Sequence, residues 1–453
     1  MILSVRPSRA CGSAGSSLQA IARESLPGIL SSSPAARSQF LRRPPQGRSP
    51  QPQRTRLPFL RVQSSRAFHA TPKRDSHTPR ISYRVAASSS GKSCRFLPTK
   101  NAYNFNPELH DAIGVAVDTQ DPAAKRKRRP DSGEDAFFVS TVGRWRGSPT
   151  DNSIAFAVAD GVGGWAESRV DPADFSHALC DYMAQAALAW DGPVEQLRAK
   201  YLLQAGYDRI VADENIPAGG STASVGVGLN DGRIELANLG DSGSVLLRQA
   251  AVHHYSIPQT HGFNTPYQLS IIPKRMRQQA SIFGGGFLED FPRDANTTTL
   301  HMHHGDVLML ATDGVFDNLN NQDILKLVTG RMICTGAWKA STSHNTGITP
   351  ADRETLDRLT GPEGVSSLSS PVFSAMPKSI SSKPATASNS NNHTYTLQSL
   401  LAASIAGEAK LASLDIRRDS PFAKEAQRYY PGDHYRGGKV DDIAVLVIVA
   451  VEE

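Results

Sequence analysis

The most regular pattern along the chain is a short apolar run, of strand length, with a carboxylate at one of its ends. Residues 154–159 form such a run and stop at Asp160, and residues 307–311 form a second that leads to Asp313. Apolar runs of four to eight residues bounded by turn residues are typical of buried strands. Three glycines follow Asp160 within four residues, so we expect the backbone to turn sharply there or to let a ligand approach closely.

Further acidic positions extend this pattern. Glu134 and Asp135 directly precede one apolar run, Asp441 and Asp442 precede another, and Asp241 lies in an expected strand-to-strand turn. One strand that ends in Asp-Gly is ordinary turn chemistry, but five acidic strand ends in one domain exceed what turns require. Clustered carboxylates repel one another unless cations neutralise them. Hard oxygen ligands suit Mg²⁺ or Mn²⁺, so the sequence indicates a metal site.

Two consecutive helices are expected between the second and third strands. Asp171 followed by Pro172 is a good helix start, with Asp as the N-cap and Pro in the first turn. Apolar residues then recur at helical spacing. His177 falls off that stripe, so we expect it at the surface rather than as a ligand. A second helix is expected over residues 193–211, which excludes a simple alternation of strands and helices.

The middle of the chain predicts an antiparallel sheet. The turn 230–232, Asn-Asp-Gly, joins a strand within 219–227 to a strand over 233–239. Strands over 244–248 and 251–255 follow, and consecutive hairpins imply antiparallel pairing. The glycines at the start of 219–227 lack the Lys-Ser/Thr of a P-loop and lead into a strand, so we interpret them as structural.

The remaining segments complete the expected domain. Residues 256–294 form a long connection with apolar content, which favours an ordered flap over the site. The histidines of 301–304 are more simply explained as a strand edge than as metal ligands. Residues 335–395 are rich in Ser, Thr, Asn and Pro, and we expect a disordered insertion there. A helix over 396–414 and a central strand over 440–449 follow.

Charge divides the chain into two parts. Residues 1–100 hold 18 of the 49 Lys and Arg and two of the 43 acids, which leaves 31 basic and 41 acidic residues for 101–453, a net charge of −10. The first part is rich in Ser, Pro and Arg, the composition of a transit peptide, and residues 64–71 resemble a matrix-processing site. We predict a mitochondrial presequence over 1–68, a flexible linker over 69–105 and one domain over 106–453. A disordered basic arm and a chloroplast address are the alternatives.

The same composition excludes other classes of protein. An acidic body argues against a nucleic-acid binder, although the whole chain has a net charge of +6. No run of about 18 apolar residues exists, so no membrane span is expected. Four cysteines without close spacing predict neither a zinc site nor a disulfide framework. The basic run 125–129 is best explained as a solvated loop, ahead of a nuclear signal or a rim that attracts phosphorylated substrates.

With these positions assigned, the chain resembles the protein phosphatase 2C type of metal-dependent Ser/Thr phosphatases from about residue 110 to 453. Six motifs in the family's order carry the resemblance: Glu134-Asp135, Asp160-Gly161-x-Gly163-Gly164, Gly220-Ser221-Thr222-Ala223, Asn238-x-Gly240-Asp241-Ser242, Thr312-Asp313-Gly314 and Asp441-Asp442-Ile443. Residues 160–165 and 263–269 resemble the mitochondrial branch. The resemblance implies an α+β fold, an α-β-β-α sandwich of two antiparallel sheets flanked by helices.

The resemblance also implies a site for two Mn²⁺ or Mg²⁺ ions. Carried over position by position, Asp160 bridges both ions, and Asp313 and Asp441 complete one of them. The Gly161 carbonyl and Glu134 serve the other ion, partly through water.

Further roles follow in the same way. Asp135 would orient a metal-bound water, and Asp241 with Asp313 and Asp317 would fit the weaker third ion of some family members. Asp442 stands where the family often has Asn, so it is expected to act behind the ligands.

Two positions depart from the family's pattern. Val162 stands where many members have a His proposed to protonate the leaving alkoxide. Pro130 stands where the phosphate-binding Arg usually lies, so that Arg129 or Arg128 is at best a displaced substitute.

These features predict a metal-dependent phosphatase that hydrolyses phosphoserine or phosphothreonine on mitochondrial matrix proteins through a metal-activated water. Two cations ~3.5–4 Å apart can hold the nucleophile and the phosphoryl oxygens for direct attack, and no cysteine lies in a glycine-rich cradle. The family branch suggests coenzyme Q biosynthesis proteins as partners. The alternatives are a catalytically weak, phosphatase-like regulator that binds partners and a phosphatase of small phosphorylated metabolites.

Overall fold

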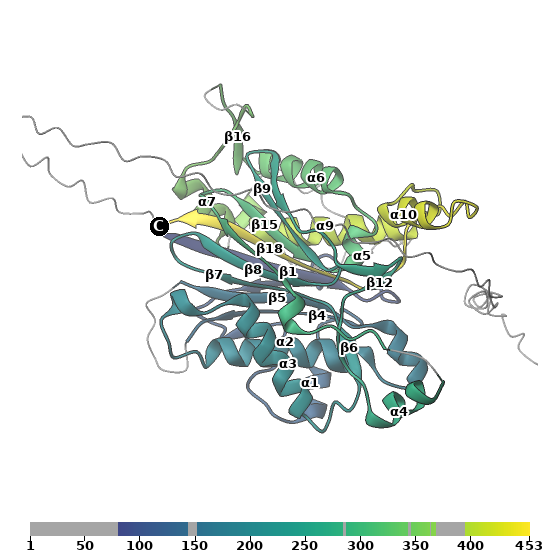
Figure 1. Ribbon diagram of the computed structural model, residues 1–453. Coiled ribbons are helices and arrows are strands. Elements are labelled where there is room, and N and C mark those ends of the chain that lie inside the picture. The colour runs from purple at the N-terminus through teal and green to yellow at the C-terminus, as the bar shows by residue number, and fades with distance from the viewer. Residues whose placement is uncertain (1–79, 144–151, 284–286, 343–345, 363, 368–394) are drawn as a thin grey trace, which may run out of the picture. The chain divides into compact units, whose positions relative to one another are not determined.

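The computed structural model describes residues 80–143, 152–283, 287–342, 346–362, 364–367 and 395–453. Its main strands form two antiparallel sheets that pack face to face, with helices on both outer faces (Figure 1). The α+β class and the α-β-β-α sandwich expected from the sequence are confirmed. The predicted presequence, residues 1–68, lies outside the described residues.

The first sheet has the strand order β10-β9-β15-β18-β1-β2. Its strands are β1 (Ile81–Ser90), β2 (Ala102–Phe105), β9 (Gly243–Arg248), β10 (Ala251–Tyr255), β15 (Val307–Ala311) and β18 (Ile443–Glu452). The second sheet has the order β14-β8-β7-β5-β4-β3. Its strands are β3 (Ala112–Ile113), β4 (Asp135–Thr141), β5 (Ile154–Asp160), β7 (Ala223–Gly228), β8 (Arg233–Leu239) and β14 (Asn296–His301).

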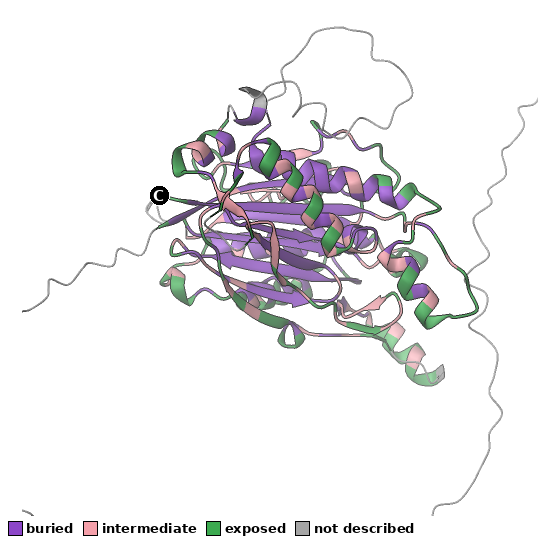
Figure 2. Ribbon diagram, turned by 90° about the horizontal axis from the view of Figure 1, so that it is seen from above, coloured by how far each residue is buried: buried purple, intermediate pink, exposed green. Residues whose placement is uncertain are grey.

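Strand alternation divides the apolar residues between two kinds of core. Along β18, Leu446 and Ile448 pack between the sheets, whereas Val445 and Val447 pack against the helices on the outer face. Successive side chains of a strand point to opposite faces, so a strand buried on both faces is apolar throughout. Figure 2 shows the strands buried along most of their length. The prediction that the last strand is central is therefore confirmed.

Helices cover the two outer faces (Figure 1). The second sheet is covered by α2 (Pro172–Leu188) and α3 (Ala199–Ala212), and the first by α6 (Asn321–Cys334), α7 (Arg353–Thr360) and α9 (Leu397–Leu414). The predicted start of α2 is confirmed, because the Asp171 side chain accepts a hydrogen bond from the Ala173 amide. None of the described helices is long and apolar enough to cross a membrane.

His177 is buried, so the prediction that it lies at the surface is wrong. Helix α1 (Pro122–Lys127) and the residues before it cover the outer side of α2, and His177 borders the pocket between them. The apolar stripe of α2 identifies the face that packs on the sheet, but it does not indicate the contact between α2 and α1.

The expected linker over 69–105 is wrong for its described part. β1 pairs with β18 along its whole length, from Ile81 opposite Glu452 to Ser90 opposite Ile443. Sequence composition concealed the strand because small residues such as Ser88 and Ser89 fill it, yet both are fully buried. The domain therefore begins before residue 106.

The expected disordered insertion over 335–395 is wrong for its first half, and residues 368–394 lie outside the described residues. β16 (Trp338–Ala340) pairs with β17 (Ile348–Pro350), and α7 and η5 (Gly364–Ser367) follow. Trp338 is buried and donates its indole N–H to the Gly305 carbonyl at 2.9 Å. A few large apolar residues thus anchor a segment whose average composition is polar.

The long connection over 256–294 is ordered in its described part. It holds β11 (Thr260–Gly262), β12 (Thr265–Pro266), β13 (Leu269–Ile271), α4 (Lys274–Phe283) and η4 (Pro292–Asp294). β13 pairs with β6 (Gly219–Ser221), beside the end of β5. The remaining elements are η2 (Gly163–Ser168), η3 (Val194–Gln196), α5 (Asp313–Phe316) and α10 (Pro421–Tyr429).

Candidate metal centre

The antiparallel pairing brings the acidic strand ends to one edge of the sandwich. In the second sheet the first residue of β4, Asp135, pairs with the last residue of β5, Asp160. In the first sheet the end of β15, at Ala311, pairs with Val445 near the start of β18. In an antiparallel pair the end of one strand lies beside the start of the next. The acids at these strand ends therefore lie close together.

Three carboxylates form the centre of this cluster. One oxygen from each of Asp160, Asp241 and Asp313 lies within 4.8 Å of the others. Asp241 comes from the turn between β8 and β9, where Gly240 adopts a φ of 97° that favours glycine. The buried Oδ1 of Asp241 has no hydrogen-bond partner among the described residues. An unpaired buried oxygen beside two further carboxylates fits a hard divalent cation.

The carboxylates of this cluster repel one another. Burial, followed by the charge of Asp313, raises the pKa of Asp160 well above its usual value. The same two causes raise the pKa of Asp241 to about 7. Burial also raises the pKa values of Asp317 and Asp441. Carboxylates with raised pKa values are those that gain most from a bound cation.

Asp135 and Asp442 stand behind this centre. Thr312 Oγ1 donates to Asp135 Oδ2 at 2.7 Å, and burial, followed by the charge of Asp442, raises the pKa of Asp135. Asp442 Oδ2 accepts from the Glu134 amide at 2.9 Å, and its Oδ1 accepts from the Lys92 amide. Asp442 therefore fixes the loop that carries Glu134.

Glu134 and Gly161 face the same edge from the β4 and β5 ends. Glu134 Oε2 accepts from Lys92 Nζ at 2.9 Å. The Gly161 amide donates to the Glu134 carbonyl at 3.2 Å. A Cβ on Gly161 would lie 2.7 Å from the Pro172 carbonyl oxygen, so only glycine fits this close approach of backbone segments.

Lys439 enters the cluster from the side of β18. Its Nζ lies 2.6 Å from Asp313 Oδ2, 2.7 Å from Asp317 Oδ2 and 3.0 Å from Asp441 Oδ2. Burial alone would lower the pKa of Lys439, but the three carboxylates raise it. Lys439 thus joins Asp317 and Asp441 to Asp313, which belongs to the three-carboxylate centre.

Two lysines that sequence reasoning missed therefore border the acidic cluster, Lys92 and Lys439. Their signals in the sequence were weak: Lys439 stands two residues before Asp441, after two glycines, and Lys92 lies in the segment interpreted as a linker. A carboxylate pattern indicates a cation, but it does not say whether the cation is a metal ion or a side chain.

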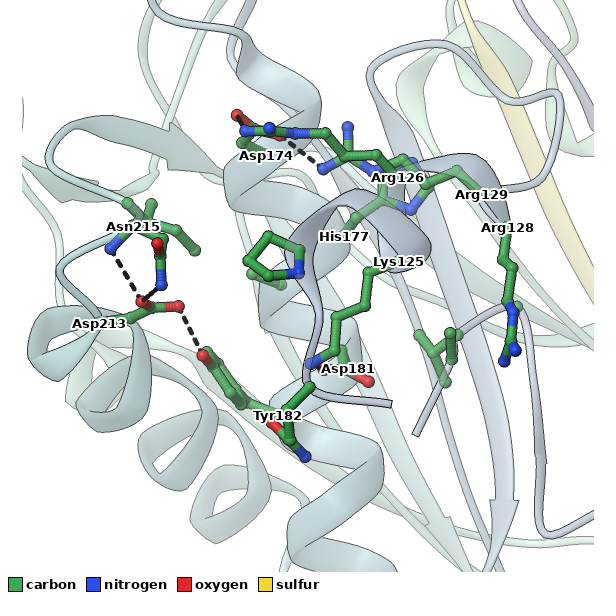
Figure 3. Close-up of a pocket in the computed structure, with 17 residues that line it drawn as sticks. Lys125, Arg126, Arg128, Arg129, Asp174, His177, Asp181, Tyr182, Asp213 and Asn215 are labelled. Carbon is green, nitrogen blue, oxygen red and sulfur yellow. Dashed lines mark hydrogen bonds and ion pairs between the residues drawn. The ribbon is translucent and has the colours of Figure 1, made fainter. Parts of the chain in front are cut away.

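Four of the five residues in the basic run 125–129 pair with neighbouring acids. Lys125 pairs with Asp181 at 2.6 Å, and Arg126 pairs with Asp174 at 2.7 Å. Figure 3 shows these side chains around a pocket of about 170 Å³ between α1 and α2. The expected solvated loop is wrong for residues 125–127, which form the end of α1 on α2, although residues 126–128 are exposed as expected.

The arginines considered as substitutes for a phosphate ligand are held in the same way. Arg129 pairs with Asp174 at 2.6 Å and with Asp171 at 3.7 Å, and Arg128 pairs with Asp118 at 2.6 Å. Val162 is the N-cap of η2, and its amide donates to the Gly220 carbonyl at 3.0 Å. Its apolar side chain offers no proton to a leaving group.

Comparison with known proteins places this sandwich, with acids at one edge, among the protein phosphatases. The protein phosphatase 2C profile matches residues 127–343. The mitochondrial protein phosphatase 2C homolog 7 of Saccharomyces cerevisiae is 36% identical over 264 residues, 58% of this chain and 73% of the yeast protein. The protein phosphatase PTC7 homolog of Xenopus laevis is 30% identical over 326 residues, 71% of this chain and 82% of that protein.

The chain also has a partial likeness to solved structures. The X-ray structure of the photosystem II phosphatase PBCP has 24% sequence identity and a TM-score of 0.45, and the match covers 70% of this chain and 92% of that one. The chain belongs to the protein phosphatase 2C family.

Proposed function

We propose that this protein is a mitochondrial serine/threonine phosphatase that hydrolyses phosphorylated proteins with the help of two divalent cations, Mn²⁺ or Mg²⁺. The observation that carries the proposal is the group of three carboxylates, Asp160, Asp241 and Asp313, whose oxygens lie within 4.8 Å of one another. Family membership supports the reaction, and the name of the yeast relative supports the compartment. A matrix location and coenzyme Q biosynthesis proteins as partners are part of the proposal.

The metal ligands are proposed as follows. Asp160 would bridge both ions, with Asp313 and Asp441 on one and the Gly161 carbonyl and Glu134 on the other. When bound, such ions supply a water of lowered pKa and neutralise phosphoryl oxygens. Glu134 and Asp441 are now paired with Lys92 and Lys439, so binding would exchange an ammonium partner for a metal ion.

The chain's own residues prepare the site for the reaction. Asp135 accepts a hydrogen bond from Thr312 Oγ1 at 2.7 Å, which fixes its carboxylate, and it would orient a metal-bound water. Asp241 is proposed to serve a weaker third ion, although Lys439 pairs with Asp313 and Asp317, the two further residues expected there. A leaving alkoxide would take its proton from water, since Val162 offers none.

The test is phosphate release from a phosphothreonine peptide by the full chain with Mn²⁺, with Mg²⁺ and with EDTA. Asp160→Asn and Asp313→Asn should each lower metal-dependent kcat by at least about a hundredfold, as loss of a principal electrostatic group does. Asp118→Asn, which removes an exposed acid paired with Arg128, should leave kcat unchanged.

The opposite result would favour a second function. Folded protein that binds Mn²⁺ but releases no phosphate would fit the catalytically weak regulator that binds partners. Pro130 and Val162, and the engagement of Arg129 by Asp174, favour that alternative.

A further inference from the structure

A groove of about 520 Å³ is continuous with the acidic cluster. Asp241, Asp313 and Asp317 belong to both, so a ligand in the groove reaches the proposed metal ions. The volume lies within the range of ligand-binding clefts. The groove therefore has room for more than a phosphate group.

Two segments that are distant in sequence supply part of the apolar lining of the groove. Ile257 comes from the connection after β10, and Phe422 comes from the first turn of α10. The Phe263 ring lies 5.2 Å from the Phe422 ring, which joins the two segments. The Phe422 amide donates to the Asp317 carbonyl at 3.0 Å. The apolar wall is thus fixed to the acidic cluster by a backbone hydrogen bond.

Part of this wall is unusually exposed. Ile257 is 72% exposed and Tyr255 is 55% exposed. Large apolar side chains that gather in one groove, rather than singly over the surface, indicate a binding surface. A ligand that covers them gains free energy from their burial.

The charge of the groove restricts what it can bind. Among the described residues that line it, Glu425 joins the three aspartates and no side chain is basic. Lys439, which pairs with Asp313 and Asp317, and the metal ions would neutralise the aspartates but not Glu425, which lies on the exposed side of α10. A basic side chain of the ligand is therefore favoured near Glu425, and an acidic one is repelled.

We propose that this groove binds the residues that flank phosphoserine or phosphothreonine in a protein substrate, and that it selects an aliphatic or aromatic residue together with a basic one. The inference rests on the proposed function and adds the class of substrate. A small phosphorylated metabolite would occupy the metal end alone, without covering Ile257 or meeting Glu425.

The experiment compares p-nitrophenyl phosphate with three phosphothreonine peptides that differ only in their flanks. One peptide carries Leu and Arg, the second carries Leu and Asp, and the third carries Ser at both positions. The wild-type enzyme with Mn²⁺ should give its highest kcat/KM for the peptide with Leu and Arg. Turnover of p-nitrophenyl phosphate reports the metal centre without the groove.

Ile257→Ser tests the apolar contact. It should lower kcat/KM about tenfold for the peptides with Leu, because covering one aliphatic side chain contributes roughly that factor. It should leave p-nitrophenyl phosphate turnover unchanged. Leu109→Ser is the matched control, because Leu109 is an equally exposed aliphatic residue, at 75%. It follows the end of β2, which pairs with Val85. Ser90, at the acidic end of β1, lies farther along that strand.

Glu425→Lys tests the charge. It should lower kcat/KM for the peptide with Arg and raise it for the peptide with Asp, by about threefold each at low salt, as expected for an exposed charge pair. A merely structural role of Glu425 would change both peptides in the same direction.

The outcomes separate the two proposals. A wild-type enzyme that turns over p-nitrophenyl phosphate and all peptides equally would overturn the groove inference and leave the phosphatase intact, and so would equal effects of Ile257→Ser and Leu109→Ser. A wild-type enzyme that hydrolyses neither kind of substrate would overturn both proposals.

Discussion

Replacement of Lys439 by Met should lower the thermal stability of the metal-free protein and change that of the metal-bound protein much less. Lys439 Nζ lies 2.6–3.0 Å from oxygens of Asp313, Asp317 and Asp441. At an effective dielectric constant of about 20, each such contact is attractive by roughly 6 kcal/mol. Desolvation of the buried groups offsets most of this sum, and removal of one partner from a buried ion pair typically costs about 3–5 kcal/mol.

The assay is thermal unfolding of the wild type and Lys439→Met in EDTA and over a Mn²⁺ titration. In EDTA the variant should unfold about 4–6 °C lower, a value obtained from the average unfolding entropy per residue. Mn²⁺ should recover most of this difference, because a divalent ion replaces the lost ammonium charge. The variant should also bind Mn²⁺ more tightly, since a competing cation has been removed.

The control is Lys424→Met. Lys424 is an exposed lysine whose Nζ lies 3.7 Å from a single carboxylate oxygen of Asp419, so its loss should change neither quantity measurably. If Lys439→Met were as stable as the wild type in EDTA, or bound Mn²⁺ no more tightly, Lys439 would not be the cation that balances the cluster.

Two further predictions concern the supports of the site. Burial lowers the pKa of His177 to about 3, below its unfolded value, so its contribution to stability is present above pH ~6.5 and is lost as pH falls toward 3. Between pH 6.5 and 5, wild-type protein should therefore lose about 2 kcal/mol more of its unfolding free energy than His177→Asn in urea unfolding; parallel curves would contradict this. Gly314→Ala should destabilise the fold by about 1–3 kcal/mol or more and impair phosphate release, because its Cβ would lie 1.9 Å from the Asp442 carbonyl. Gly330→Ala in α6, which meets nothing within 4 Å, should be neutral or stabilising by up to about 1 kcal/mol; equal losses in the two variants would refute the steric explanation.

The sequence predicted those parts of the site that local pattern determines. Asp135 and Asp160 are strand ends and Asp313 follows β15 by two residues, and antiparallel pairing is enough to bring such positions together. It did not reveal which cation balances each carboxylate. Lys439 reaches three acids from 313 to 441, a relation that exists only after β15 and β18 have paired.

Composition failed to predict secondary structure where small residues or a single large residue form the packing contacts. β1 was missed because Ser88 and Ser89 are polar by type, yet its position between β18 and β2 buries them. Trp338 was missed because one large residue anchors a polar segment. His177 was misplaced because helical periodicity identifies one buried face, whereas α2 packs on two sides.

The pairing of β1 with β18 also determines when the protein can become active during its synthesis. Ile81 pairs with Glu452, which a ribosome adds 371 residues later. At usual elongation rates this takes on the order of 20–70 s. Until then the first sheet lacks its central strand, and Asp441 has not joined the acids of the other strands. A nascent chain therefore cannot dephosphorylate proteins that it meets before β18 has been made. The order of the strands along the chain thus delays activity until β18, which follows Asp441, has been made.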